Sequence, residues 1–476
     1  MLGSIKKAVK HAYIRRLLNQ EAASHGGEDS EADHLPPKLW GCSADENGLL
    51  SIGGVCSQAL IKQYGTPLHV VNESVLLDTY KTFLDSFRAV HPNVQLATSY
   101  KTNPVPHVIK TLHDAGSYAE VISHFELWLA LKLGVSPDKI ILNGPGKSDA
   151  MLELAIDSRV EMINIDGPEE IDKIAQLARA AGIQQNVGLR VVTSVGWSSQ
   201  FGLSIASGAA LAAFEKMLRY PELSPTGLHL HLGTGIQNIQ TYVQAVREII
   251  EFSETLEAVH GVKISDFDLG GGFGVPTVRG MDEWDLRMVS LGYSARQPNP
   301  VGVPTPADYA GALAPLLQKL KTRSDDNSQS PRVVFEPGRA ITSSSQTLLL
   351  SIIAKKPGIE NKEFLIADGG KNITMPLGWE THRIFAANKL KVKANSKYDV
   401  FGPLCHPGDI VVKNQVFPAL EAGDNLAIMD AGAYFIPNQM NFSNPRPPIV
   451  SISDGMATLV RQKEEFEDIV RLDQSG

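Results

Sequence analysis

The sequence has few cysteines, no excess of positive charge and no long apolar run, and each shortage excludes a class of protein. Three cysteines cannot form a complete set of disulfides, which indicates a reducing compartment, and we expect a cytoplasmic protein. The formal net charge of −8 argues against a general binder of nucleic acids or membrane surfaces. No stretch approaches the roughly 20 apolar residues of a membrane-spanning helix. We therefore expect neither nucleic acid nor membrane among its partners.

The 476 residues exceed one ordinary domain, and a content of 43% hydrophobic and 20% charged residues is typical of a globular protein. Residues 1–20 are basic, with no acidic side chain before Glu21, and form either a transit peptide or a surface helix. Scarce serines and the lack of an apolar signal core favour a peripheral helix. A linker rich in Glu, Asp, Gly and Ser follows over Ala22–Leu35, so residues 1–35 are predicted to be a flexible extension.

Short apolar runs alternate with helical patterns between Leu68 and Ala340, and several of the helical patterns close on glycine. Such alternation, repeated eight times, is typical of a parallel (β/α)8 barrel of the TIM type. A doubly wound open sheet is the alternative, because strands are hard to count from sequence. The predicted strands are Leu96–Tyr100, Tyr118–Ser123, Lys139–Leu142, Met162–Ile165, Gly188–Val192, Gly227–Leu232, Asp266–Leu269 and Arg332–Phe335.

After Ala340 the helical spacing nearly vanishes, and alternating or β-branched runs broken by Pro, Gly and Asn replace it. We therefore predict a barrel over residues 68–340 and a mostly antiparallel β domain over residues 341–476, which the segment 36–67 joins. A Pro/Gly-rich insertion over residues 273–305 is longer than ordinary barrel loops. Insertions of that length are lids, interface elements or disordered segments.

The stretch Asn93–Pro106, NVQLATSYKTNPVP, places Lys101 just past the end of a buried strand. Burial favours the neutral amine, so we expect Lys101 to lose its proton more easily than a surface lysine, which suits Schiff-base chemistry. A solvated loop lysine is the alternative.

Polar residues and glycines lie at or near the carboxyl ends of the other predicted strands as well. Barrels of this kind carry their chemistry at the carboxyl ends of the strands, so these residues are predicted to converge on one site. They are Lys101, Glu120, Asn143, Asp166, Arg190, His229 with His231, Gly270–Gly272, and Glu336 with Arg339.

The triple glycine lets backbone amides approach an anion closely, and with Thr234 it is interpreted as a phosphate cradle, although a tight turn has the same sequence. Glu336 and Arg339 form either a local ion pair or separate contacts, the acid with a heteroaromatic N–H and the arginine with phosphate. His231 is a candidate for stacking on a ring, and His229 for a structural role.

Six motifs occur in this order along the chain: SYKTNP, HLHLGTG, DLGGGFG, FEPGRA, GPLCHPGD and MDAGAY. They resemble those of the fold-type III pyridoxal-phosphate decarboxylases, whose members include diaminopimelate, ornithine and arginine decarboxylases. The resemblance runs from about Leu68 to the end of the chain.

The resemblance implies that Lys101 holds pyridoxal 5'-phosphate as a Schiff base, that His231 stacks on its ring and that Glu336 pairs with its pyridine nitrogen. Cys405 corresponds to a cysteine that protonates the substrate carbon from the partner subunit, and Glu120 falls near an acidic residue of the second strand. This implies a head-to-tail homodimer that shares its sites and acts on a small amino-acid substrate, with no metal. The phosphate contacts implied are Thr234, Gly270, Gly271, Gly272, Arg339 and Tyr434.

Two departures from the family pattern concern the substrate. An Arg-Pro-x-x-Tyr stretch of diaminopimelate decarboxylases corresponds to Met375–Trp379, so its arginine and tyrosine are both missing. A Cys-Glu-Ser-Gly-Asp stretch corresponds to Cys405–Asp409, with His406 in place of the acid. A distal ammonium facing a histidine loses a charge-assisted hydrogen bond of about 1.5–3 kcal/mol. The candidate substrate residues are therefore Met375, Trp379, His406 and Asp409.

These departures favour decarboxylation of a substrate with a distal carboxylate or neutral group, such as a siderophore or secondary-metabolite precursor. Three alternatives remain open. One is a diaminopimelate decarboxylase that makes lysine and grips the distal end with other residues. Another is an amino-acid racemase, in which Cys405 would be the second base. The last is a non-catalytic homologue without cofactor.

Overall fold

The computed structural model describes residues 6, 9–10, 12–14, 16–17, 35–321, 330–358 and 363–474. The chain divides into two compact units, Met1–Pro36 and Pro37–Gly476. The eight described residues before residue 18 are helical, and residues 22–34 of the predicted linker lie outside the described residues. Among the residues described, no helix has both the length and the apolar character needed to cross a bilayer.

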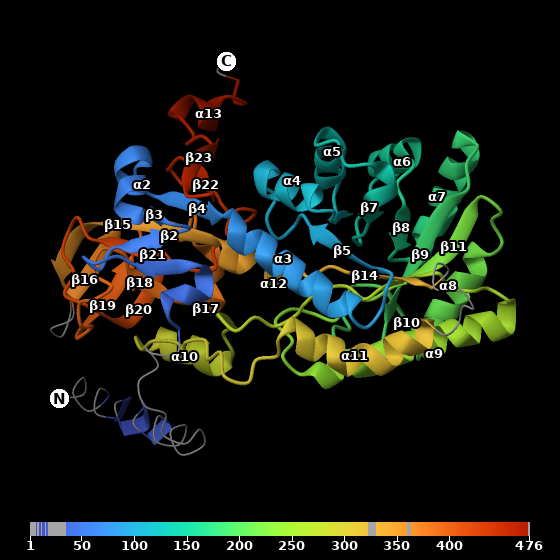
Figure 1. Ribbon diagram of the computed structural model, residues 1–476, viewed down its shortest axis with the longest axis horizontal. Helices are drawn as coiled ribbons and strands as arrows, with labels where there is room; N and C mark the ends of the chain where they lie inside the picture. Colours follow the sequence, from blue (N-terminus) through green and yellow to red (C-terminus); the bar gives the residue numbers. More distant parts are fainter. Residues whose placement is uncertain are drawn as a thin grey trace. The chain divides into compact units, whose positions relative to one another are not determined.

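Eight parallel strands close into a barrel, which confirms the predicted TIM-like fold and excludes the open sheet (Figure 1). Each strand pairs with the next one along the chain, including β8 with β9. The ring closes where the last strand, β14, pairs with the first, β5. All eight pairings are parallel, so the carboxyl ends of the strands meet at one rim. The strands are β5 (Val94–Ser99), β6 (Tyr118–Val121), β7 (Ile140–Leu142), β8 (Met162–Ile165), β9 (Gln185–Val192), β11 (Leu223–His229), β12 (Asp266–Asp268) and β14 (Arg332–Phe335).

Helices surround the barrel, and their apolar faces explain where they pack. In α3 (Glu73–Arg88), Tyr80, Phe83 and Phe87 recur at helical spacing and are buried against the barrel. Phe83 lies edge-on to Phe273 at 4.8 Å, and Phe87 lies 4.1 Å from Phe335, between ring centroids. Phe273 follows the triple glycine and Phe335 precedes Glu336, so this aromatic core holds both segments in place. The other main helices are α4 (Pro106–Asp114), α5 (His124–Lys132), α6 (Asp149–Ser158), α7 (Pro168–Ala181), α8 (Ala209–Met217), α9 (Ile239–His260) and α11 (Pro306–Lys321).

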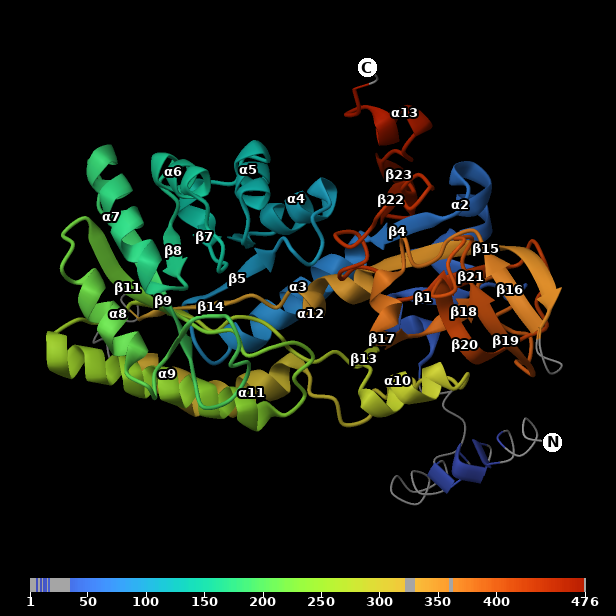
Figure 2. The same cartoon turned by 180° about the vertical axis from the view of Figure 1, so that it is seen from behind.

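A second, mostly antiparallel sheet forms the β domain, which lies beside the barrel in both ribbon views (Figure 2). Two pairings in it are parallel, β16 with β19 and β22 with β4. Its core is a cluster of buried aliphatic and aromatic side chains separate from the barrel core. Its strands include β15 (Gln346–Pro357), β16 (Glu363–Ala367), β18 (Ile384–Ala386), β19 (Ser396–Phe401), β20 (Ile410–Phe417), β21 (Asn425–Ile428), β22 (Ile449–Ser453) and β23 (Met456–Arg461).

The first strand of the predicted barrel segment, β4 (Leu68–Asn72), belongs to this second sheet, where it pairs with β15 and β22. All five of its residues are buried, and a short apolar run of this kind fits either sheet equally well, so the sequence did not reveal its partners. The preceding segment forms a small sheet of its own, β1 (Cys42–Ala44), β2 (Leu50–Ile52) and β3 (Val55–Cys56). Trp40 Nε1 donates to Asp430 Oδ2 at 2.7 Å and attaches this segment to the β domain. The remaining domain boundaries stay predictions.

The insertion over residues 273–305 is ordered and connects the two domains. Its strand β13 (Val278–Gly280) pairs with β17 (Glu380–His382) of the second domain. Its helix α10 (Glu283–Ser290) starts with a capping box between Asp282 and Asp285. Asp285 is buried and accepts hydrogen bonds from Arg279 and Arg296.

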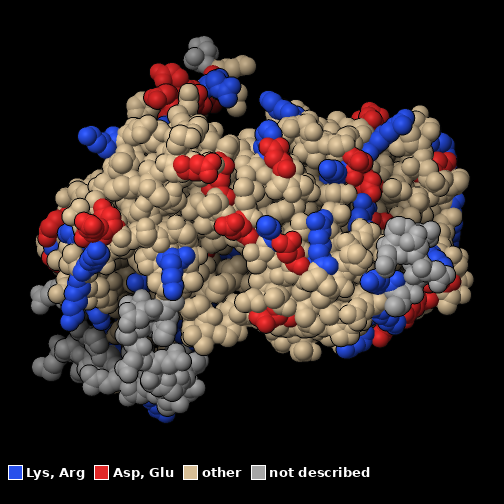
Figure 3. All heavy atoms as spheres, viewed as in Figure 1, with Lys and Arg blue, Asp and Glu red and all other residues tan. Residues whose placement is uncertain are grey.

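On the face shown in Figure 3, acidic and basic side chains are interspersed over the surface.

Candidate active site

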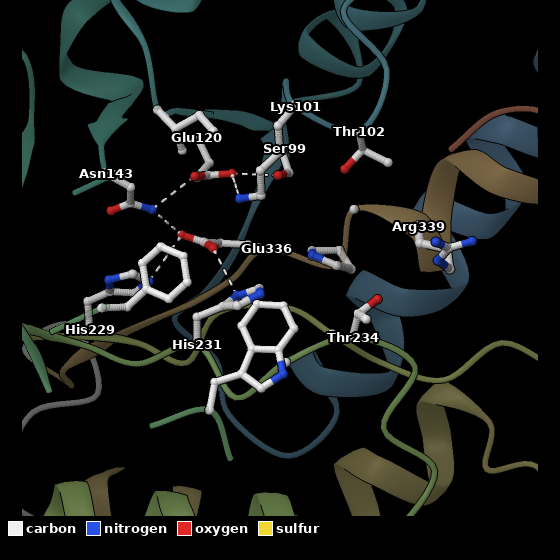
Figure 4. A pocket seen from close by; sticks show the side chains of 18 of the residues that line it. Ser99, Lys101, Thr102, Glu120, Asn143, His229, His231, Thr234, Glu336 and Arg339 are labelled. Carbon is white, nitrogen blue, oxygen red and sulfur yellow. Dashed lines mark hydrogen bonds and ion pairs between the residues drawn. The ribbon is translucent and has the colours of Figure 1, made fainter. Parts of the chain in front are cut away.

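A cavity of about 240 Å³ opens at the carboxyl ends of the barrel strands. Figure 4 shows acidic and amide side chains at one side of it and threonines with an arginine at the other. The predicted site residues that line the cavity are Lys101, Glu120, His231, Thr234, Gly272, Glu336, Arg339 and Tyr434. Asn143, Arg190 and His229, which also lie at or near the carboxyl ends of barrel strands, line it too.

Lys101 and Glu120 form an ion pair at the mouth of the barrel. Lys101 Nζ lies 2.9 Å from Glu120 Oε2, which also accepts a hydrogen bond of 2.5 Å from Ser99 Oγ. Ser99 and Glu120 are direct partners in the β5–β6 register, so the barrel itself sets this contact. The Glu120 side chain is 1% exposed and that of Lys101 is 29% exposed, which leaves the amine accessible from the cavity.

The expectation that Lys101 loses its proton easily is wrong for this arrangement. Burial alone would lower the pKa of Lys101, but the carboxylates of Glu120 and Glu336 hold it above its ordinary value. Burial would likewise raise the pKa of Glu120, yet Lys101 and Ser99 hold it below its usual range. Lys101 Nζ becomes a nucleophile only after a proton leaves it, and Glu120 Oε2 is placed to accept that proton.

Glu336 is the centre of the acidic side of the cavity. Asn143 Nδ2 donates to Glu336 Oε1 at 2.6 Å and to Glu120 Oε1 at 3.2 Å, and joins the two acids. His231 Nδ1 lies 3.8 Å from Glu336 Oε2. Burial raises the pKa of Glu336 well above its ordinary value, and Asp268 and Glu120 raise it further. Burial, Lys101 and Arg190 lower the pKa of His231 to about 3, so its ring is neutral near pH 7.

Arg339 does not pair with Glu336, so the predicted local ion pair between them is wrong. Its guanidinium binds both carboxylate oxygens of Glu380, at 3.0 Å for Nη1 to Oε2 and by a shorter Nη2–Oε1 contact. The Tyr434 ring lies 5.1 Å from the guanidinium carbon of Arg339. The backbone N–H of Tyr434 donates to the Thr102 carbonyl at 2.8 Å. The β domain thus supplies Tyr434 to the cavity wall and Glu380 as the partner of Arg339.

The triple glycine is required by the close approach of backbones. A Cβ at Gly271 would overlap the carbonyl oxygen of Glu336, and one at Gly272 would overlap that of Gly233. Gly270 and Gly271 lie behind the cavity, where the Gly271 N–H donates to His231 Nδ1 at 3.2 Å. That contact orients the histidine ring.

The predicted substrate residues and Cys405 do not line this cavity in the described part of the chain. Cys405, His406 and Trp379 are exposed, and Met375 is half-buried. Asp409 is 1% exposed, and its two oxygens accept from the backbone N–H groups of Lys371 at 2.6 Å and Leu404 at 2.7 Å. This geometry supports a loop-stabilising role for Asp409.

Sequence reasoning missed an aromatic wall of the cavity. Trp197 is 47% exposed at the rim, 6.3 Å from Phe201 and 6.0 Å from His231 between ring centroids. Phe201 in turn lies 4.5 Å from the guanidinium carbon of Arg190. Both rings lie in a Ser/Gly-rich loop after β9, where nothing in the local sequence distinguishes a cavity wall from an ordinary loop.

Comparison with known proteins agrees with this geometry. The profile of the family described as "Pyridoxal-dependent decarboxylase, pyridoxal binding domain" matches residues 77–343. The chain is 27% identical over 438 residues to diaminopimelate decarboxylase from Archaeoglobus fulgidus, which covers 89% of this chain and 96% of the relative. It is 29% identical over 441 residues to diaminopimelate decarboxylase from Halalkalibacterium halodurans, with 90% and 95% covered.

Solved structures give the same result for the fold. The diaminopimelate decarboxylase of M. jannaschii in complex with L-lysine superposes with a TM-score of 0.81 at 25% identity, over 91% of this chain and 98% of that one. The lysine/ornithine decarboxylase of Vibrio vulnificus in complex with putrescine has a TM-score of 0.69 at 21% identity, over 84% and 98%. The second likeness concerns the fold alone.

Proposed function

The chain belongs to the pyridoxal-dependent decarboxylases, and from this we propose that its barrel cavity is where an amino acid loses its α-carboxylate. Membership makes the protein a carboxy-lyase that depends on pyridoxal phosphate. The observation that carries the assignment of the site is that the Lys101 amine, the buried Glu336 carboxyl and the Arg339 side chain line a single cavity.

The residues present fit this cofactor, which offers an aldehyde, a pyridine nitrogen and a phosphate. Lys101 provides an amine for the aldehyde, and Glu336 provides an acceptor for the pyridine N–H. Thr102 Oγ1 is buried without a hydrogen-bond partner in the described residues, beside Gly338 and on the same side of the cavity as Thr234 and Arg339. An unpaired buried hydroxyl is costly, and a phosphate oxygen there would satisfy it.

When bound, pyridoxal phosphate supplies an electron sink for the charge left on the α-carbon as CO2 departs. Lys101 Nζ would hold the cofactor covalently, and Glu336 would keep its pyridine nitrogen protonated. His231, being neutral, would lie beside the ring without adding positive charge that would compete with the pyridine N–H. Glu120 holds and accepts the proton of Lys101.

The proton that replaces CO2 is assigned to Cys405 of a second copy of the chain. Cys405 is exposed and lies away from its own cavity, which supports a role at the cavity of a partner. We therefore propose a homodimer with shared sites.

For the substrate, we propose meso-diaminopimelate. The relatives named above carry that activity in their names, and this favours diaminopimelate over the non-standard substrate that the sequence motifs suggested. An amino acid with a distal carboxylate or neutral group is the second candidate, which His406, Met375 and Trp379 favour because they replace the family's charged and phenolic residues.

The test is CO2 release by the purified protein, reconstituted with pyridoxal phosphate, from diaminopimelate, lysine, ornithine and amino acids with neutral or acidic distal groups. Release from diaminopimelate with lysine as product supports the proposal, and release only from the acidic or neutral set supports the second candidate. A Lys101→Ala variant should show no release and no cofactor retained after borohydride reduction. Cα–H exchange in deuterated water without CO2 release would instead indicate a racemase. A protein that neither retains the cofactor nor releases CO2 would contradict the proposed function.

A further inference from the structure

At the wall of the cavity, His229, Asp268 and Glu336 form a buried cluster at the carboxyl ends of three neighbouring strands, β11, β12 and β14. One ligand atom of each residue lies within 4.8 Å of those of the other two. The three residues are 1%, 5% and 3% exposed, so water does not solvate them. Glu336 faces the cavity, whereas Asp268 lies behind it and does not line the cavity.

Only one of the two carboxylate oxygens of Asp268 has a hydrogen-bond donor among the residues described. Its Oδ1 accepts from the Gly270 N–H at 3.0 Å. Its Oδ2 is buried and receives no N–H or O–H donor from the residues described. A carboxylate oxygen of Asp268 lies within 4.8 Å of a carboxylate oxygen of Glu336. Two buried carboxylates this close to each other do not both ionise, so one of them carries a proton.

Among the residues described, Asp268 forms no ion pair, and the basic side chains beside Glu336 are those of His229, with Nε2 at 3.7 Å, and His231, with Nδ1 at 3.8 Å. Both ring nitrogens of His229 lack a hydrogen-bond partner in the described structure, and burial, Arg190 and His231 lower its pKa well below the ordinary value. Lys101 is paired with Glu120, whose negative charge also raises the pKa of Asp268. Burial raises the pKa of Asp268 to about 7 and holds that of Glu336 well above its ordinary value, in agreement with one shared proton.

We propose that Asp268 is a positioning residue which, as a neutral carboxylic acid, donates a hydrogen bond to Glu336 whenever a pyridine N–H is bound there. Without cofactor, the proton of the pair resides on Glu336. When the ring N–H arrives, the O–H bond of Glu336 breaks, one forms on Asp268 Oδ2, and no proton is exchanged with solvent. Glu336 is then an ionised acceptor with a donor on each side. The inference rests on the proposed role of Glu336.

Asp268→Asn is a close mimic of the acid in this state. Its amide oxygen keeps the bond to the Gly270 N–H, and its amide N–H2 supplies a permanent donor to Glu336. The apo form of this variant should bind pyridoxal phosphate within about threefold of wild type, whereas Asp268→Ala, which lacks the donor, should bind it at least about tenfold more weakly. If asparagine lost as much affinity as alanine, an ionised Asp268 would be the active form and the proposal would be wrong.

Infrared difference spectra provide a readout that does not depend on activity. With pyridoxal phosphate bound, wild type minus Asp268→Asn at neutral pH should show the carbonyl stretch of a protonated carboxylic acid, sensitive to deuterium oxide. Without cofactor the same band should appear in wild type minus Glu336→Gln, because the proton then resides on Glu336. Absence of this band would overturn the proposal even if the enzyme is active. If the protein did not bind pyridoxal phosphate at all, the proposed function would fail, while the band in the apo protein would still decide whether the pair shares a proton.

Asp430 provides a matched control. It is equally buried, but its oxygens accept from Trp40 Nε1 at 2.7 Å, Thr277 Oγ1 at 2.8 Å and Ser343 Oγ at 3.1 Å. Asp430→Asn must turn an amide N–H2 toward donors, so it should lower the melting temperature, whereas Asp268→Asn should not. Equal losses of stability in both variants would show that Asp268, like Asp430, acts only as a hydrogen-bond acceptor.

Discussion

Replacing Asn143 with alanine removes the amide that joins the two acids of the cavity. Its Nδ2 donates to Glu336 Oε1 at 2.6 Å and to Glu120 Oε1 at 3.2 Å, and its Oδ1 accepts from Asn164 Nδ2 at 2.8 Å. Asn143 is 3% exposed, so water does not replace these contacts without rearrangement. The variant therefore weakens Glu336 as an acceptor for a pyridine N–H.

The magnitude follows from the type of bond lost. A hydrogen bond to an ionised group contributes about 1.5–3 kcal/mol, and each 1.4 kcal/mol is a factor of about ten in affinity. Asn143→Ala should therefore bind pyridoxal phosphate about 10- to 100-fold more weakly. The unpaired amide of Asn164 costs a further ~1–3 kcal/mol, but in folding stability rather than in affinity.

The assay is a fluorescence or dialysis titration of the apo protein with pyridoxal phosphate. Asn388 is the matched control, because its amide donates to Asp424 Oδ1 at 2.9 Å and accepts from the Asn425 N–H at 3.1 Å, far from the cavity. Asn388→Ala should leave the affinity unchanged. If Asn143→Ala bound the cofactor as tightly as this control, Asn143 would not tune Glu336, and the argument from the acidic side of the cavity would be refuted.

Two further predictions concern the insertion and the cavity rim. Burial would raise the pKa of Asp285, but hydrogen bonds from Arg296 and Arg279 hold it below its ordinary value of 3.8. Its stabilising effect is therefore complete above pH 3.8 and is lost as the pH falls below that value, so hydrogen exchange in α10, corrected for intrinsic rates, should rise on acidification. Asp285→Asn should abolish this pH dependence, and an unchanged profile would contradict the assignment. Trp197, 47% exposed at the rim, should become less accessible to acrylamide when pyridoxal phosphate binds. Trp197→Phe should remove the cofactor-dependent change in acrylamide quenching. Trp128→Phe, at a site 46% exposed on α5, should leave that change intact. If Trp128→Phe removed the change and Trp197→Phe did not, the cofactor would not approach Trp197.

The sequence predicted the barrel because most of its strands are apolar runs delimited by a turn or a helix start. Met162–Ile165 and Arg332–Phe335 even have the predicted bounds. The site residues were found for the same reason, since Lys101 and Glu336 directly follow such runs. The predictions that were wrong concern contacts between segments that are distant in the sequence. The protonation of Lys101 depends on acids carried by β6 and β14, and the partner of Arg339 is Glu380, in the other domain.

The pairing of β4 with β15 and β22 also determines the order in which the protein can be completed. During synthesis β4 leaves the ribosome before the barrel, and both of its partner strands leave after it. The Trp40–Asp430 bond likewise joins residues 390 positions apart. Such contacts cannot form before nearly the whole chain exists, so the β domain finishes folding last, around a barrel that can form earlier. For protein engineering, a barrel fragment cut at residue 68 would carry an apolar strand without its neighbours and would tend to aggregate, whereas one beginning with α3 would not.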